Sequence, residues 1–284
     1  MRIFKYLHPD RIDVLESTRI CFSSPQNLND PFELRPPLRL YESDELAWEA
    51  AAGLLPQILE DTYAKFSEDA KLLVSREQLA AAVQVQMLSR ESGFASLIKK
   101  LMPEIASRFN SATEQRIGIL CLTESPDDLL MWAHYGCSHE GFVLEFDPEA
   151  SFFHQRRSEK DEFRSLRPVI YSPTRPTLTF ADAKDVSPLL TKSDHWSYEQ
   201  EWRMMVDLND ASVVLDAGEK KFHLFDFPAS AIKSVIFGSR MSQTKKHRIL
   251  ELIANRPQLG HITCFQAAVD DILFKLNIIP FVSS

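Results

Sequence analysis

Three polar segments of this sequence place bulky aromatic residues beside side chains that titrate or donate hydrogen bonds: residues 22–33, 131–136 and 192–203. Carboxylates in such a setting can stabilise a developing positive charge, and aromatic faces can stack on a planar ligand ring. The predicted helices and strands around these segments must bring them together for a shared site to exist.

The second segment is predicted to form a short helix over residues 129–135 that stops at Gly136. His134 and Tyr135 are candidate catalytic groups on this helix, and Trp132 is a candidate for stacking on a base or nicotinamide ring. The alternative is that Trp132 serves packing alone, because an amphipathic helix buries one of its faces.

The third segment leads into a predicted strand over residues 201–206. Glu201 directly precedes apolar residues, so it should lie at the rim of a buried strand and is the candidate catalytic carboxylate. Glu199 is predicted to be more solvated, and Lys192 and Arg203 are candidate ligand-binding cations. The alternative is structural: the two glutamates pair with Lys192 or Arg203.

The first segment contains residues 27–33, which are dense in side chains that bond their own backbone or fix φ, so an ordered turn is predicted. Ordered loops often carry function, which makes Asn29 and Asp30 candidate ligand-binding residues. We expect residues 29–33 of this turn to pack beside residues 132–135, since buried polar groups need partners. A purely structural turn is the alternative.

Composition narrows the function classes. The 284 residues include 40 acidic and 32 basic side chains, and the net charge of −8 removes the diffuse attraction used in non-specific nucleic-acid or membrane-surface binding. Signatures of P-loop NTPases, Rossmann dehydrogenases, zincins and α/β-hydrolases are missing. The cysteines are widely spaced, no export signal is expected, and no apolar run approaches roughly 20 residues. A cytoplasmic protein without a metal site or membrane span is predicted.

The order of predicted elements favours an α+β fold with a mixed, mainly antiparallel sheet and a helical insertion after the second strand. Residues 43–113 are rich in Ala, Leu, Glu, Gln and Lys, which predicts about three helices broken near Pro56, Ser75 and Gly93. We therefore expect one domain over residues 1–284 with a helical insertion over 43–113.

Several blocks of the sequence resemble the bacterial family known as Domain of Unknown Function 2971. The blocks are residues 5–7, 22–25, 29–33, 121–124, 131–135, 141–147 and 192–203, with 236–238 beyond them. Thr123 stands where many members carry Ser, which keeps the hydroxyl.

The order of these parts is also similar, at a distance, to ADP-ribosyltransferase folds. That resemblance implies that Lys5 and Ser23 hold a dinucleotide, that Tyr135 or Trp132 sandwiches the nicotinamide, and that Glu201 bonds the ribose 2′-hydroxyl. NAD is then the expected substrate of a transferase or glycohydrolase that needs no metal. The complete set of predicted ligand-binding residues is Lys5, Tyr6, Ser23, Asn29, Asp30, Trp132, Lys192, Glu199 and Arg203.

Two other classes of function stay open. A non-enzymatic recognition or regulatory module, in stress or phage defence, would bind a nucleotide, peptide or protein partner in an aromatic-lined groove. A nuclease or phosphodiesterase would act on nucleic acid with Asp30, Glu33, Glu199 and Glu201 as metal ligands. Convergence of Glu201, His134 and Lys192 in one concave pocket would favour catalysis.

Overall fold

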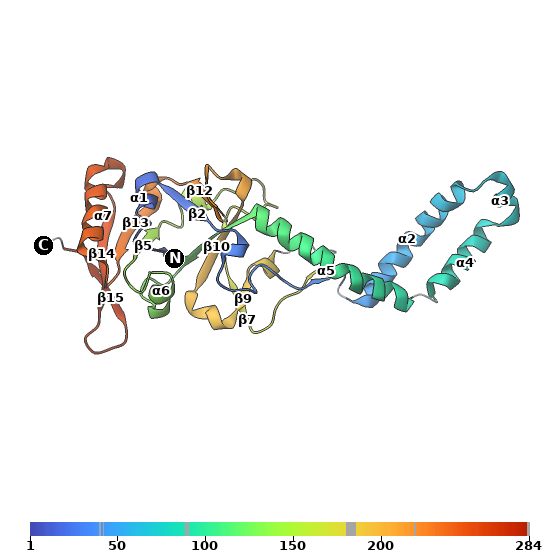
Figure 1. Ribbon diagram of the computed structural model, residues 1–284, viewed down its shortest axis with the longest axis horizontal. Helices are drawn as coiled ribbons and strands as arrows, with labels where there is room; N and C mark the ends of the chain where they lie inside the picture. Colours follow the sequence, from blue (N-terminus) through green and yellow to red (C-terminus); the bar gives the residue numbers. More distant parts are fainter. Residues whose placement is uncertain (40, 42, 89–90, 180–185, 219, 283–284) are drawn as a thin grey trace. The chain divides into compact units, whose positions relative to one another are not determined.

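The computed structural model describes residues 1–39, 41, 43–88, 91–179, 186–218 and 220–282 (Figure 1). Internal contacts divide the chain into two compact units. The first consists of residues 1–35, 112–175 and 186–284, and the second of residues 36–111 and 176–185.

The first unit is built on an eight-stranded sheet with the order β15-β14-β13-β5-β1-β4-β10-β6. Neighbouring strands run antiparallel except β13 and β14, so the predicted α+β fold with a mixed, mainly antiparallel sheet is confirmed. The strands are β1 (Ile3–Leu7), β4 (Ile117–Thr123), β5 (Phe142–Phe146), β6 (Leu166–Pro168), β10 (Glu201–Asp207), β13 (Ile232–Phe237), β14 (Thr263–Val269) and β15 (Leu276–Pro280).

Smaller elements complete the first unit. β2 (Arg19–Phe22), β11 (Val213–Ala217) and β12 (Lys220–Asp226) form a three-stranded sheet, and β7 (Ile170–Ser172) pairs with β9 (Thr191–Ser193). The helices are α1 (Asp13–Ser17), α6 (Leu129–His134) and α7 (Gln243–Asn255), with the 3-10 turns η1 (Pro25–Asn27) and η5 (Asp194–Glu199) among the shorter ones.

Side chains of the central strands alternate between two faces of the large sheet. Ile3 and Leu7 of β1 belong to the main apolar cluster, which also contains Ile249 of α7. Phe4, between them, belongs to a second cluster with Trp132 of α6. A third cluster forms around residues of β4 and β10. The second and third clusters flank the polar residues that are candidates for a site.

The second unit is mainly helical, with α2 (Asp44–Ala64), α3 (Glu68–Leu73), α4 (Arg76–Leu88) and most of α5 (Glu91–Arg116), and with β3 (Leu38–Arg39) paired to β8 (Leu178–Thr179). Ser75 separates α3 from α4 as predicted, and α4 ends at Leu88 and α5 begins at Glu91, close to the break predicted near Gly93. The break predicted near Pro56 is wrong because α2 runs through it. Pro56 is exposed, and a 21-residue helix has enough other backbone hydrogen bonds to tolerate one that is missing. The prediction of one domain with an insertion over 43–113 stays a prediction. No helix in the described part of the chain is long and apolar enough to cross a membrane.

The end of β13 depends on a glycine. The Gly238 N–H donates to the Gly141 carbonyl at 2.9 Å. A Cβ at Gly238 would lie 2.2 Å from the His139 carbonyl oxygen and 2.7 Å from that of Gly141. The backbone must therefore move to accept any side chain.

We expect Gly238→Ala to lower the free energy of unfolding by about 2–4 kcal/mol, since both clashing atoms are backbone. Gly260→Ala is the matched control, because its Cβ would lie 3.4 Å from the nearest atom, the Pro257 carbonyl oxygen. Urea denaturation of both variants measures the difference. Equal stability of the two variants would contradict the close approach at Gly238.

Candidate functional site

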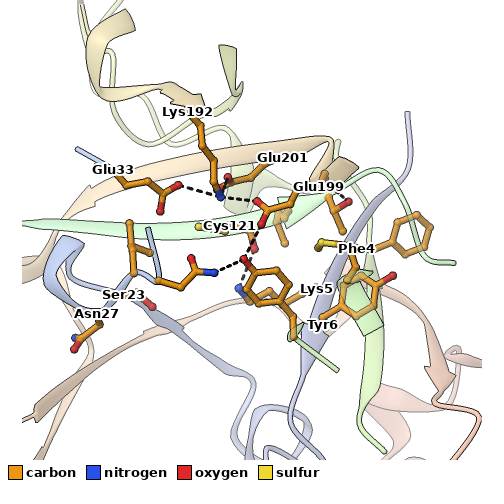
Figure 2. Close-up of a pocket in the computed structure, with 16 residues that line it drawn as sticks. Phe4, Lys5, Tyr6, Ser23, Asn27, Glu33, Cys121, Lys192, Glu199 and Glu201 are labelled. Atoms are coloured by element: carbon orange, nitrogen blue, oxygen red, sulfur yellow. Dashed lines mark hydrogen bonds and ion pairs between the residues drawn. The ribbon is translucent and has the colours of Figure 1, made fainter. Parts of the chain in front are cut away.

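A cavity of about 230 Å³ lies where β1 separates from β4 (Figure 2). β1 pairs with β4 at a single position, Phe4 opposite Thr123, while Ser23 bridges β4 at Ile119. Lys5 spans the gap, because its Nζ donates to the Cys121 carbonyl at 2.9 Å. The cavity is lined by Phe4, Lys5, Tyr6, Ser23, Asn27, Leu28, Asn29, Glu33, Cys121, Leu122, Thr123, Met131, Tyr135, Lys192, Glu199 and Glu201.

The ammonium of Lys192 lies among three buried carboxylates at the wall of this cavity (Figure 2). Its Nζ is 2.5 Å from Glu199, 3.0 Å from Glu33 and 3.1 Å from Glu201. Burial alone would lower the pKa of Lys192, but the carboxylates outweigh burial and raise it. Lys192 is therefore a fixed positive charge at neutral pH.

Arg203 supplies the second cation, from a position with no exposed surface. Its Nε and Nη2 donate to the two carboxylate oxygens of Glu201 at 2.6 and 2.9 Å, and Nη2 also contacts Glu33. Such a bidentate contact is the strong form of an arginine–carboxylate pair. Three carboxylates against two cations leave one negative charge in excess.

The two glutamates of the third polar segment have different protonation equilibria. Burial raises the pKa of Glu199 in spite of the nearby Lys192. Burial opposes ionisation of Glu201 as well, but Arg203 and Lys192 outweigh it and lower the pKa of Glu201 to about 2. Environments that push two carboxyl pKa values apart are typical of acid–base and electrostatic catalysis.

The prediction that Glu199 is more solvated than Glu201 is wrong, because the residues are 3% and 4% exposed. Glu199 ends η5 and Glu201 begins β10, and Gln200 between them has a left-handed backbone with φ 44°. The Thr123 hydroxyl fixes this junction by donating to the Glu199 carbonyl oxygen at 2.5 Å. Both carboxylates consequently reach Lys192.

Tyr135 connects the first polar segment to Glu199. Its hydroxyl donates to Glu199 Oε1 at 2.7 Å and accepts from Asn29 Nδ2 at 2.9 Å. Burial and the contact with Glu199 raise the pKa of Tyr135, so the hydroxyl stays protonated as a donor. The Asn29 bond confirms the expected contact between the turn over residues 29–33 and residues 132–135 at the end of α6.

Asp30 is buried but does not line the cavity. Its Oδ1 accepts the Phe32 N–H at 2.9 Å, and its carbonyl accepts the Glu33 N–H at 3.2 Å. The predicted ordered turn is confirmed by these bonds. Asp30 therefore acts on the turn that presents Glu33, and its assignment as a ligand-binding residue stays a prediction.

Trp132 and His134 of α6 also lie outside the cavity lining. Trp132 is fully buried, donates from Nε1 to the Pro126 carbonyl at 2.9 Å and meets Tyr6 edge to face, so its ring packs in the core. His134 is exposed, with Nδ1 3.3 Å from the Tyr198 hydroxyl. Glu201 and Lys192 thus converge on one cavity while His134 does not. Arg203 lies behind Glu201 rather than on the lining.

Some residues of the site were not among the predicted ligand-binding or catalytic groups. The sequence identifies Glu33 only as a possible metal ligand, although its place in the 29–33 block is a usable signal. Cys121 and Met131 carry no polar pattern that predicts a cavity wall. In the described part of the chain, no group of three His, Cys, Asp or Glu side chains could hold a metal ion. The Lys192 ammonium occupies the space between Glu33, Glu199 and Glu201 that a metal ion would need.

Residues 131–204 match the family described as "Protein of unknown function (DUF2971)". The matched range includes five residues of the site: Tyr135, Lys192, Glu199, Glu201 and Arg203. The predicted resemblance to this family is therefore confirmed over this segment. The chain matches no curated protein and no solved structure. The distant likeness to ADP-ribosyltransferase folds stays a prediction.

We expect Glu201→Gln and Glu199→Gln to affect stability differently. Glu201→Gln leaves buried Arg203 without its bidentate carboxylate and should lower the free energy of unfolding by about 3 kcal/mol. Glu199→Gln removes the excess negative charge and leaves two cations with two carboxylates, so stability should be kept. Chemical denaturation at neutral pH compares them. A greater loss in Glu199→Gln would contradict this distribution of charge.

The pH dependence of stability gives a second prediction. The pKa of Glu201 falls from an ordinary 4.5 to about 2 on folding, so its stabilisation is present above 4.5 and lost as pH falls toward 2. Glu199, whose pKa is raised, acts in the opposite sense. We expect the free energy of unfolding to fall between about pH 5 and 2, with a smaller slope in Glu201→Gln. Identical slopes would show that Glu201 is not the group responsible.

Proposed function

We propose that this member of the DUF2971 family is an NAD-consuming enzyme, of ADP-ribosyltransferase-like or glycohydrolase-like type, in which Glu199 is the carboxylate that acts on the ligand. The observation that carries the proposal is the environment of Glu199. Glu199 is a buried carboxylate at the cavity wall and accepts a hydrogen bond from Tyr135. Its pKa is raised, whereas the pKa of Glu201 is lowered. In this proposal Glu201 positions Lys192 and Arg203 instead of touching substrate.

The reaction breaks the bond between nicotinamide nitrogen and ribose carbon. The bonding electron pair leaves with nicotinamide, which becomes neutral, and the ribose carbon becomes an oxocarbenium-like cation. Ionised Glu199 stabilises that cation electrostatically. Water, or a hydroxyl or amine of a target, then forms the new bond to the same carbon and releases one proton. Glu199 at the cavity wall can accept that proton, because its raised pKa favours protonation.

The remaining lining residues suit a ligand with one aromatic ring and polar groups. Lys5 donates one described hydrogen bond, to Cys121, whereas an ammonium has three N–H groups. Its other donors can serve a phosphate or ribose oxygen, as can the hydroxyl of Ser23. Tyr6 and Tyr135 contribute aromatic surface. The cavity of about 230 Å³ is below the roughly 300–1,000 Å³ of drug-sized sites, so it suits the nicotinamide riboside part of NAD.

A second function is favoured by a different observation. The carboxylate oxygens of Glu199 and Glu201 already have protein partners. Carboxylates whose oxygens are paired in this way can act as rigid support for a recognition module in stress or phage defence, which binds a nucleotide, peptide or protein without turnover. Both functions fit a cytoplasmic protein of bacterial origin, where the described Cys21, Cys121, Cys137 and Cys264 would remain thiols.

The decisive measurement is nicotinamide release from NAD by the full chain, followed by chromatography. We expect turnover that falls by about 100-fold or more in Glu199→Gln, because Gln keeps the shape but loses the charge that stabilises the cation. Activity should also fall as pH drops through the raised pKa of Glu199, since the ionised form is needed.

Glu149→Gln is the matched control, because Glu149 is exposed and lies outside the cavity lining. It should release nicotinamide at the wild-type rate. Calorimetric titration with NAD distinguishes the two functions: binding without release supports the recognition module. If NAD is neither bound nor cleaved, the NAD proposal is overturned. Full activity in folded Glu199→Gln would overturn the role of Glu199.

A further inference from the structure

The hydroxyl of Tyr135 lies between a carboxylate and an amide, and it has one proton to donate. Its oxygen is 2.7 Å from Glu199 Oε1 and 2.9 Å from Asn29 Nδ2. An amide nitrogen donates and cannot accept, so Asn29 occupies a lone pair of the hydroxyl oxygen. The proton of Tyr135 is therefore directed to Glu199.

Both carboxylate oxygens of Glu199 accept a hydrogen bond as a result. Oε1 accepts from Tyr135 at 2.7 Å, and Oε2 accepts from the Lys192 ammonium at 2.5 Å (Figure 2). A protonated Glu199 would place its own O–H against one of these donors. Hydrogen bonds to the charged form of a carboxyl group favour that form. The two donors thus oppose the burial that raises the pKa of Glu199.

The turn that carries Asn29 is also attached to the other side of this carboxylate. Glu33, later in the same turn, is 3.0 Å from Lys192 Nζ. The contacts therefore form a closed ring that runs through Asn29, Tyr135, Glu199, Lys192 and Glu33. Asn29 is the exposed member of this ring, whereas the two glutamates and the lysine are buried. A change at Asn29 can reach Glu199 through Tyr135 without removing a buried charge.

We propose that Asn29 is a positioning residue of the site: its amide directs the Tyr135 hydroxyl to Glu199 and so supports the ionised carboxylate that a developing cation needs. The inference rests on the proposed function for the use of that carboxylate, although the hydrogen bonds stand without it. Asn29 then acts through Tyr135 instead of binding the ligand directly. An aspartate at position 29 would reverse the arrangement, because its carboxylate accepts and would compete with Glu199 for the Tyr135 proton.

An NMR titration of the full chain, labelled at the glutamate carboxyl carbons, measures this effect without any ligand. The spectrum of Glu199→Gln identifies the Glu199 signal by its absence. We expect Asn29→Asp to raise the pKa of Glu199 and to move its titration midpoint up by about 1 pH unit, because the carboxylate loses one of its two donors. The new carboxylate is exposed and ionises at about pH 4, below the range in which Glu199 titrates.

The added negative charge also raises the pKa of Glu199, so two comparisons separate charge from hydrogen bonding. Asn27→Asp adds the same charge on the same turn, at an exposed side chain that lines the cavity and has no described bond to Tyr135. It should move the midpoint less. Tyr135→Phe removes the hydroxyl, and in this background Asn29→Asp should add no more than Asn27→Asp does. The other charged or titratable groups around Glu199 are the same in all these variants: Lys5, Glu33, Tyr171, Lys192, Tyr198 and Glu201.

Equal shifts in Asn29→Asp and Asn27→Asp would overturn the role of Asn29, as would a full Asn29→Asp shift in the Tyr135→Phe background. Nicotinamide release by the same variants tests the proposed function separately. Where the wild type releases nicotinamide, the acid limb of the pH–rate profile should move up with the NMR midpoint in Asn29→Asp. Without release by the wild type the proposed function fails, and the titration still decides the role of Asn29.

Discussion

The site depends on the ammonium of Lys192 being placed among three buried carboxylates. Removing charges from water is costly, and the cost is offset only when opposite charges and hydrogen bonds surround each ion. Lys192 and Arg203 together supply two positive charges against three negative ones. The excess is relieved most readily at Glu199, whose pKa is raised. A buried ion network thus produces one carboxyl group that differs from its neighbours.

The ion network also holds in place the segments around the cavity that have little regular secondary structure. Glu33 comes from the turn after η1, Lys192 from the short strand β9, and Glu199 from the end of η5. Only Glu201 and Arg203 belong to a long strand of the large sheet. Charge-assisted bonds therefore fasten three irregular segments to β10. Rigidity at the cavity wall follows from these bonds more than from backbone ladders.

Local patterns in the sequence were sufficient to predict much of the fold and part of the site. The helix predicted over residues 129–135 is found at Leu129–His134, and the antiparallel sheet and the contact of Asn29 with Tyr135 were expected. The burial of Glu199 could not be predicted, because it depends on the left-handed Gln200 and on Lys192 from another strand. Trp132 was ambiguous for a similar reason: helical spacing identifies a face but not what covers it. The helix that runs through Pro56 shows that propensity is a weak guide inside long helices.

Charged and neutral partners have different effects on Glu199. Removing the Lys192 ammonium would leave buried carboxylates without compensation, so the ion pairs determine where Glu199 lies. The Tyr135 hydroxyl is neutral and has one proton, so its direction depends on the groups that compete for that proton. A hydroxyl and an amide can therefore change how well the charge of Glu199 is stabilised while the ion pairs keep its position. Because Asn29 is exposed, this adjustment is made at the surface of the turn, apart from the buried network on which stability depends.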